Sequence, residues 1–202
     1  SMTLFRCSVL KKRNSNKFLD TPDEVYAVGE VLDEIDWPDH FKRTGGITSQ
    51  GVTRFGPKGY DTWPLYASEK DDTSFYEFAY WKLKDWENEL GMQTNASLIR
   101  LEFHPDNKPI DVQGESNKAQ ILDTKTYAHS HQWIKSLPSI PESVSYSSVR
   151  DPQGGGINFA VYEESAVSNF SFYQSVTMII RDEFNVEVIF PNKTKVTVTP
   201  IK

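Results

Sequence analysis

The residues best able to do chemistry here are an arginine, a tyrosine and a glutamate that follow one another closely. Arg54 stands in the loop Gly-Val-Thr-Arg-Phe-Gly-Pro (51–57), Tyr66 in the short run Leu65–Ser68, and Glu77 comes soon after. A guanidinium offers a bidentate fork to phosphate, a tyrosine offers a flat ring face, and a glutamate offers negative charge. Each is usually only a solvated side chain when it occurs alone. Their order predicts a site for a phosphorylated ligand that carries a ring.

The neighbours of Glu77 favour a pocket wall over an ordinary solvated surface. An apolar stripe at intervals of four and three residues predicts a helix over 73–90, with Asp71 and Asp72 as caps and Gly91 at its end. Glu77 lies off that stripe, on a face with three other large side chains: Tyr80, Trp81 and Lys84. A carboxylate beside aromatic rings is expected to have a raised pKa.

The patterning that positions these residues predicts an α+β fold with more strand than helix. Residues 36–62 are rich in Gly, Pro, Asp and Thr and are expected to be mostly loop. We expect one compact domain over 1–202, with its core at about 50–180 and a loop or helix extension over 11–50. The expected elements are strands over 3–10, 65–68, 97–104, 143–150, 157–162 and 176–180, a C-terminal β-hairpin of 186–190 and 195–199, a short helix over 21–32, and a wholly or partly helical segment over 118–135.

Composition excludes several classes of protein. The chain has 202 residues with 5 Trp, 9 Tyr and 12 Phe, which is enough aromatic side chain to build a core and excludes a disordered chain. The formal charge of −6 argues against direct binding of nucleic acid as the main task. No apolar run approaches the roughly 20 residues of a membrane span, so we expect no membrane partner.

Metal chemistry has little support in the sequence. The single cysteine, Cys7, cannot form an internal disulfide and could join a zinc site only with several non-cysteine partners. His129 and His131 have the spacing of neighbours on one face of a strand and could hold a metal. No cluster of partners accompanies them, and an exposed or hydrogen-bonded histidine is the commoner case. We therefore expect no metal.

A second polar block follows much later in the chain. Residues 145–159 read Ser-Tyr-Ser-Ser-Val-Arg-Asp-Pro-Gln-Gly-Gly-Gly-Ile-Asn-Phe and include Ser148 and Arg150. The glycines allow a positive φ and close approach of a ligand to the backbone, although a simple hairpin turn is equally compatible. The spacing differs from that of a dinucleotide fingerprint.

Together the two blocks resemble the RES-domain family, which is named for an Arg, a Glu and a Ser. Its members are toxins of bacterial toxin–antitoxin pairs with a fold like that of ADP-ribosyltransferases. The resemblance covers about residues 50–165 well, and Phe5-Arg6 and Gln132-Trp133 extend it. Two departures affect the loops: Val52-Thr53 replaces Gly-Gly before the arginine, and Ser147 replaces the proline before the serine.

The resemblance implies that NAD is the substrate and that the bond between ribose and nicotinamide breaks. Glu77 would stabilise the oxocarbenium-like charge on the ribose. Arg54, helped by Arg6, would clamp the pyrophosphate or an adjacent hydroxyl, and Tyr66 would pack against the nicotinamide ring or the ribose. Ser148 would hydrogen-bond the ligand without acting as a nucleophile. Arg150 would either bind phosphate or pair structurally with an acid such as Asp151.

The resemblance leaves the acceptor open. Water would give an NAD glycohydrolase, phosphate an NAD phosphorylase, and a protein side chain a mono-ADP-ribosyltransferase. The first two, which destroy NAD and arrest growth, are the favoured expectation. The family also suggests a helix-turn-helix antitoxin that blocks the NAD pocket, and action in the cytoplasm, either of a resident toxin or of a secreted effector. A non-catalytic module is the competing hypothesis, and retention of Arg54, Tyr66, Glu77 and Ser148 together argues against it.

Overall fold

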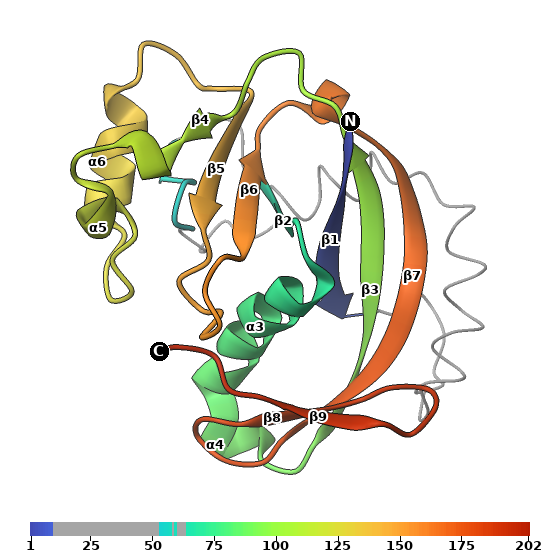
Figure 1. Cartoon of the computed structure of the whole chain (residues 1–202). Helices are drawn as coiled ribbons and strands as arrows, with labels where there is room; N and C mark the ends of the chain where they lie inside the picture. The colour runs from blue at the N-terminus through green and yellow to red at the C-terminus, as the bar shows by residue number, and fades with distance from the viewer. Residues whose placement is uncertain (10–52, 58, 60–63) are drawn as a thin grey trace.

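The computed structural model describes residues 1–9, 53–57, 59 and 64–202 of the chain. Within these residues the strands form one nine-stranded sheet in the order β4-β5-β6-β2-β1-β3-β7-β8-β9 (Figure 1). Only the pairing of β4 with β5 is parallel among them. The strands are β1 (Met2–Val9), β2 (Leu65–Ser68), β3 (Gln93–Phe103), β4 (Ile110–Asp111), β5 (Ser143–Ser147), β6 (Ile157–Val161), β7 (Val167–Ile180), β8 (Val186–Ile189) and β9 (Lys195–Val198).

The sheet divides into two halves where β1 meets β2. β1 pairs with β3 from Met2 to Val9, whereas it meets β2 at the pair Phe5 and Ser68. From there the halves diverge, so that β4, β5, β6 and β2 lie to one side of Figure 1 and β1, β3 and β7 to the other. Diverging strands leave backbone groups without ladder partners. One of them, the Tyr66 carbonyl, accepts a hydrogen bond of 2.8 Å from Nη1 of Arg6 on β1.

Helix α3 (Asp71–Lys82) packs against β1 and β2 and so lies below the line where the halves meet (Figure 1). Phe75, Ala79 and Leu83 are buried at intervals of four in a cluster with side chains of β1, β3, β7, β8 and β9. Burial of each large side chain contributes about 1.5–3 kcal/mol. The helix continues through a 3-10 turn, η1 (Leu83–Asp85), into α4 (Trp86–Glu89), and Gly91 with a φ of 76° follows its end.

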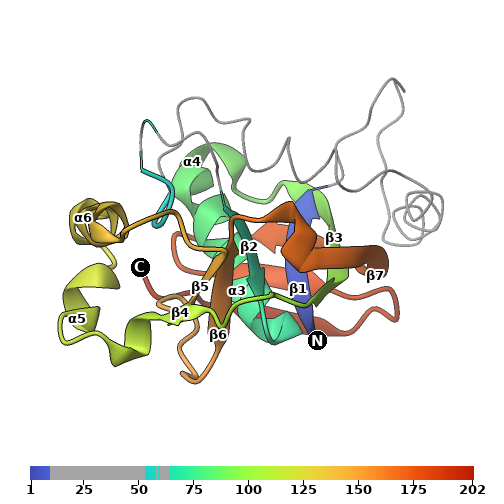
Figure 2. The ribbon, with the colours of Figure 1, turned by 90° about the horizontal axis from the view of Figure 1, so that it is seen from above.

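Two short helices cover the other half of the sheet, beside β4 and β5 (Figures 1 and 2). These are α5 (Lys118–Ile121), preceded by the 3-10 turn η2 (Val112–Gly114), and α6 (Ala128–Ser136). Their apolar side chains form a cluster with β5 and β6 that also encloses Phe55, which has no exposed surface.

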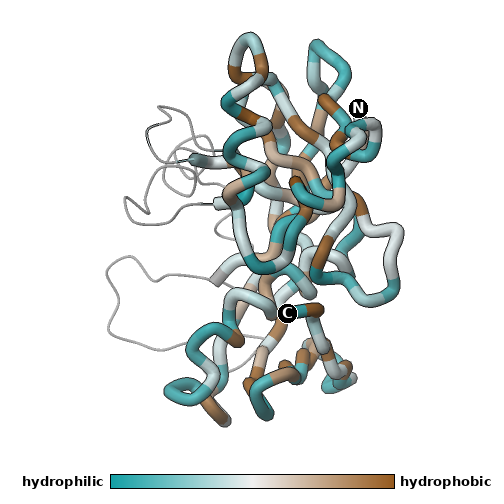
Figure 3. Tube along the Cα trace, turned by 90° about the vertical axis from the view of Figure 1, so that its left-hand side faces the viewer, coloured by the Kyte–Doolittle hydropathy of each residue, from teal (hydrophilic) through white to brown (hydrophobic). Residues whose placement is uncertain are grey.

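Between the halves, Leu4 and Leu101 pack with Phe159 and Val161 in a third cluster. A last 3-10 turn, η3 (Glu164–Ala166), joins β6 to β7. Hydrophobic and hydrophilic residues alternate along much of the chain in Figure 3, as expected for strands that bury one face.

The mixed α+β class and most of the expected elements are confirmed. The predicted strands over 3–10, 65–68 and 157–162 correspond to β1, β2 and β6, and the predicted hairpin is β8 and β9. The glycine block lies in the connection of the antiparallel pair β5 and β6, as the hairpin interpretation predicts. The expected helix over 21–32 and most of the expected loop over 36–62 lie outside the described residues.

Several expected boundaries were wrong. The helix begins at Asp71 rather than Thr73, with Lys70 at its N-cap, so that Asp71 and Asp72 form the first turn instead of capping it. The strand expected over 97–104 begins at Gln93, and that expected over 176–180 is the last part of β7. Each extension pairs with the predicted part of the other strand, Asn95 with Thr177 and Arg100 with Ser171 among them, and polar residues in the extensions hide it from an apolar alternation.

Two further expected elements are interrupted by side chains that bind backbone. The helical segment expected over 118–135 breaks between α5 and α6, where Oδ1 of Asp123 accepts the N–H groups of Lys125 and Thr126 at 2.7 and 3.3 Å. Such turns compete with helix. The strand expected over 143–150 ends at Ser147 because the hydroxyl of Ser148 turns the chain.

Candidate functional site

The carboxylate of Glu77 on α3 is held by two side chains from the β5–β6 half of the sheet. Oγ of Ser148, directly after β5, and Nδ2 of Asn158, on β6, each donate to Oε1 at 2.6 Å. Hydrogen bonds to an ionised oxygen at this length are among the strong ones in proteins. Oε2 has no partner among the residues that the structure describes. One carboxylate oxygen is therefore fixed and the other is left for a ligand.

The turn after β5 orients Ser148. Its Oγ accepts the backbone N–H groups of Arg150 and Asp151, each at 3.2 Å. Its own N–H donates to the Gly156 carbonyl at 2.8 Å. The one hydroxyl proton goes to Glu77, so this serine positions the glutamate. Its predicted contact with the ligand stays a prediction.

Asn158 is the partner of Glu77 that the sequence did not single out. It is 2% exposed, and its Oδ1 accepts the hydroxyl of Ser68 at 2.6 Å. Ser68 is buried at the end of β2, where it pairs with Asn158 in the ladder. The available signal was a polar residue between Ile157 and Phe159 in an otherwise apolar strand, because a buried amide must find partners.

Burial raises the pKa of Glu77, as predicted from its aromatic surroundings, since desolvation disfavours the charged form. The hydrogen bonds from Ser148 and Asn158 oppose this rise, and so do the positive charges of Arg150 and Arg54. The tyrosines that feel the charge of Glu77 are not the one expected from the helix face, Tyr80. They are Tyr127 and Tyr146, whose pKa values are raised first by burial and further by the charge of Glu77. Burial thus destabilises the ionised carboxylate, and its two hydrogen bonds and the two arginine charges offset part of that cost.

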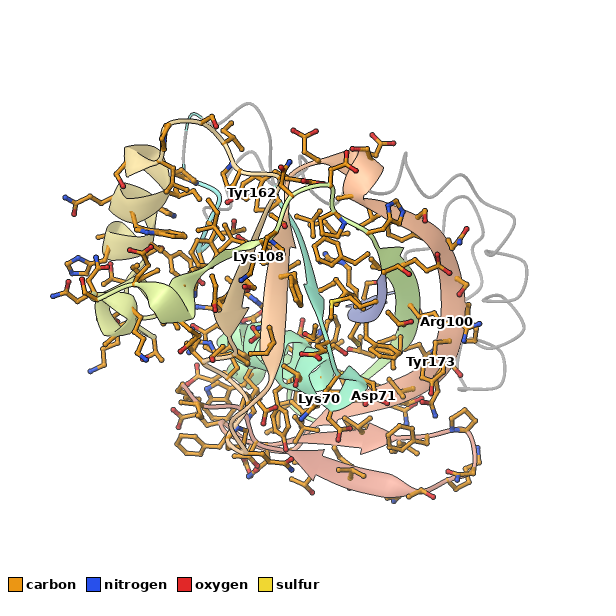
Figure 4. All side chains as sticks on the ribbon, turned by 45° about the horizontal axis from the view of Figure 1, so that its top comes forward. Lys70, Asp71, Arg100, Lys108, Tyr162 and Tyr173 are labelled. Atoms are coloured by element: carbon orange, nitrogen blue, oxygen red, sulfur yellow. The ribbon has the colours of Figure 1, made fainter. Side chains whose placement is uncertain are left out.

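The loop that carries Arg54 is fastened from several sides. Phe55 packs edge-on against Trp133 and Tyr146, with ring centroids 5.9 and 4.9 Å away. Three side chains bind the loop carbonyls: Ser130 to Arg54 at 2.6 Å, His131 to Thr53 at 2.7 Å and Tyr162, labelled in Figure 4, to Phe55 at 2.5 Å. The loop is therefore a rigid support.

The side chain of Arg54 is buried, with 6% of its surface exposed. Its Nη1 donates to the carbonyls of Ile121 and Asp123 at 3.1 and 2.9 Å, and the guanidinium lies 5.1 Å from the ring centroid of Tyr127. One nitrogen therefore holds the end of α5. Nη2 and Nε have no hydrogen bond to a described residue, so the predicted clamp on phosphate stays a prediction for these two nitrogens.

Tyr66 supports the same loop. Its hydroxyl donates to Oγ1 of Thr53 at 2.8 Å and accepts the N–H of Phe55 at 3.0 Å. Burial, as the largest cause, raises the pKa of this phenol, so it stays protonated. The structure thus gives the hydroxyl a positioning task. Packing of the ring against nicotinamide or ribose stays a prediction.

Arg150 is 2% exposed and is used structurally. Its guanidinium stacks on Tyr80 at 3.4 Å from the ring centroid and donates to the carbonyls of Ile201 and Thr124, each at 3.2 Å. The expected structural alternative, a pair with Asp151, does not occur, because Asp151 instead accepts from Thr73 at 3.0 Å. Burial lowers the pKa of Arg150. Its charge still acts on Glu77.

Arg6 has a buried nitrogen that no described residue binds. Nη1 donates to the Tyr66 carbonyl, but Nε has no hydrogen-bond partner in the described part of the chain. Burial lowers the pKa of this guanidinium too. An orphaned buried N–H costs about 1–3 kcal/mol, and an anionic ligand atom would satisfy it. The expected role of Arg6 in binding the ligand fits this geometry and stays a prediction.

The glycine block closes the site against the start of α3, where Lys70 and Asp71 are labelled in Figure 4. Gly154 and Gly155 have φ values of 70° and 72°, which other residues rarely adopt. A Cβ on Gly156 would lie 2.4 Å from Oγ1 of Thr73 and 2.9 Å from Oδ2 of Asp151. Glycine is therefore needed for the turn and for contact with the helix.

The two histidines considered as metal ligands lie on a helix. His129 and His131 are on α6, within the segment expected to be wholly or partly helical, so the strand spacing does not apply to them. No group of three or more potential metal ligands occurs among the described residues. None of the helices in that part of the chain has the length and apolar character needed to span a bilayer.

The structure is a strand-rich α+β domain with a half-buried glutamate that is held in place near two arginines. A family model, the RES domain, matches residues 30–179, and the chain belongs to the RES-domain family. A search of curated proteins finds no match to the sequence. The family assignment, expected from the motifs, is therefore confirmed by the match.

Proposed function

We propose that the chain is an NAD-consuming enzyme that breaks the bond between ribose and nicotinamide. The observation that carries this proposal is the carboxylate of Glu77, held through Oε1 by Ser148 and Asn158 with Oε2 left over. A fixed negative charge beside a reacting centre stabilises a developing cation without reorganising in the reaction. Membership of the RES-domain family supports NAD as the substrate.

In the proposed reaction the electron pair of the C–N bond leaves with nicotinamide, and the ribose carbon becomes oxocarbenium-like. Oε2 of Glu77 stabilises this cation and holds a ribose hydroxyl. Ser148 and Asn158 keep the carboxylate ionised and in one orientation. An acceptor then adds to the ribose carbon and loses its proton to solvent.

The arginines supply the positive charge that a diphosphate requires. Arg6 offers its Nε, and Arg54 offers Nη2 and its own Nε, none of which has a hydrogen bond to a described residue. The loop of Arg54 is preset by Tyr66, Ser130 and His131, so binding orders little of it. Arg150, which stacks on Tyr80 and donates to two carbonyls, is proposed to contribute charge without direct contact.

The fold is proposed to be that of the ADP-ribosyltransferases. Two sheet halves that diverge at β1 and β2, with the glutamate helix below the junction (Figure 1), are the features of the fold that support this proposal. We further propose that the protein is a toxin that acts on NAD in the cytoplasm and is neutralised by a helix-turn-helix antitoxin that blocks this site. Both statements rest on the family.

The test is to incubate the purified protein with NAD, with and without phosphate, and to identify the products by mass spectrometry. Nicotinamide and ADP-ribose would indicate a glycohydrolase, and a phosphate-dependent ADP-ribose phosphate would indicate a phosphorylase. If NAD stayed intact until a second protein was added, and that protein then became modified, the chain would be a transferase instead. Intact NAD in every tube would contradict the proposal.

The toxin proposal has a separate test. Expression of the native chain in bacteria should arrest growth and lower cellular NAD, whereas expression of the Glu77→Gln variant at an equal level should do neither. Growth arrest with unchanged NAD would separate toxicity from the proposed reaction.

A further inference from the structure

A buried chain of three polar side chains crosses from β2 through β6 to α3. Oγ of Ser68 donates to Oδ1 of Asn158, and Nδ2 of Asn158 donates to Oε1 of Glu77, both at 2.6 Å. Ser68 and Asn158 are 3% and 2% exposed, so water does not replace these bonds. A buried amide is expensive unless both of its ends are satisfied.

The ionised carboxylate determines which end of the amide faces Glu77, because it can only accept and so takes the NH₂ group of Asn158. Oδ1 is then left for the hydroxyl of Ser68, which donates to it and holds the amide in place. In the reverse orientation Oδ1 would face the carboxylate oxygen, and two acceptors would repel. The serine thus acts on the glutamate through the asparagine.

We propose that Asn158, held in place by Ser68, is a positioning residue for Glu77, fixing Oε1 so that Oε2 is the oxygen presented to substrate. This inference rests on the proposed function for its catalytic consequence. Its structural part, the control of the Glu77 carboxylate, stands without any substrate. Ser148 is the second support, from the other side of the β5–β6 hairpin.

The other titratable groups coupled to Glu77 come from four segments. The positive charges of Arg150 in the β5–β6 connection and Arg54 in the 53–56 loop favour the ionised carboxylate. Tyr127, which precedes α6, and Tyr146 on β5 have their own pKa values raised by the charge of Glu77. None of these groups donates a hydrogen bond to the carboxylate, so their effect on the pKa of Glu77 should stay the same when Asn158 is replaced.

The test compares Asn158→Leu, a near-isostere without a donor, and Ser68→Ala, which keeps the asparagine but removes the donor to its Oδ1. The control is Asn117→Ala, an exposed residue without a side-chain capping bond. The carboxyl carbon of Glu77 is followed by NMR with ¹³C-labelled glutamate over a pH series, with its signal assigned from Glu77→Gln. This readout needs no NAD.

Both test variants should titrate Glu77 at higher pH than the native chain, Asn158→Leu more than Ser68→Ala, and the control should not. Turnover of NAD should fall about 10-fold in Asn158→Leu, mainly in kcat, with KM little changed, because the asparagine acts through the glutamate. The double variant should add little to Asn158→Leu alone.

An unchanged Glu77 titration in both folded variants would overturn the inference even if the protein consumes NAD. A shifted titration in a protein that leaves NAD intact would uphold the positioning role and refute the proposed reaction. Should Asn158→Leu fail to fold, Ser68→Ala decides, since it removes one hydroxyl and keeps the packing of β6.

Discussion

Replacement of Glu77 by glutamine isolates the charge of the carboxylate from its geometry. The glutamine carbonyl can take the place of Oε1 and accept from Ser148 and Asn158, as the carboxylate does at 2.6 Å. The amide nitrogen then stands where Oε2 was. Shape and hydrogen bonds are kept, and a negative charge is lost.

The size of the effect follows from Coulomb's law. One charge pair at about 4 Å in an effective dielectric of about 20 is worth ~4 kcal/mol. Each ~1.4 kcal/mol is tenfold in rate, and the ligand and nearby arginines share part of the effect, so we expect turnover to fall by about 100- to 1000-fold. The assay is steady-state release of nicotinamide, with Glu87→Gln on the exposed face of α4 as the matched control.

The same substitution should lower turnover but raise the stability of the folded chain. Burial raises the pKa of Glu77 in the folded chain. Its contribution to stability is therefore fully present below the unfolded pKa and is lost as pH rises through the folded one. Glutamine does not titrate, so relative to the native chain the variant should gain stability between acid and neutral pH in thermal unfolding. Native turnover in a folded Glu77→Gln protein would refute the assigned role.

Three further predictions concern the surroundings of the glutamate. Turnover of the native chain should rise with pH through the raised pKa of Glu77, and Ser148→Ala should move this rise to higher pH; identical pH–rate profiles would remove the serine from the support of Glu77. Gly156→Ala should destabilise the fold by about 1–3 kcal/mol in urea unfolding, because its Cβ would meet Thr73 at 2.4 Å, and unchanged stability would contradict the close contact. Arg54→Ala should weaken NAD binding in calorimetry and also lower stability through the lost carbonyl bonds; unaltered affinity in the folded variant would exclude the clamp.

The main elements of the fold could be predicted because apolar residues follow regular periods. The stripe of Phe75, Ala79 and Leu83 indicated α3, and alternation indicated β1, β2 and β6. The first residues of β3 and most of β7 could not be predicted in this way, since polar residues such as Asn95 and Ser171 pair there. Tertiary pairing decides such segments, not local pattern.

The site was predictable as a set of residues but not as a set of contacts. Glu77 and Ser148 were expected in one site and are joined by a hydrogen bond. Arg150 has the same residue type as Arg54 and a similar local setting, yet all its donors to described residues reach carbonyls. The carbonyls that Arg150 binds belong to Thr124 and Ile201, which are distant from it in sequence. No local pattern predicts that these segments meet.

The most direct test of the central claim is the number of nicotinamide molecules released per protein molecule when the native chain is mixed with excess NAD and no other protein. In the proposed reaction Glu77 is not consumed, so we predict that each native protein molecule releases many nicotinamides. The Glu77→Gln variant should release very few. NAD that remains intact beside a folded native protein would contradict the account.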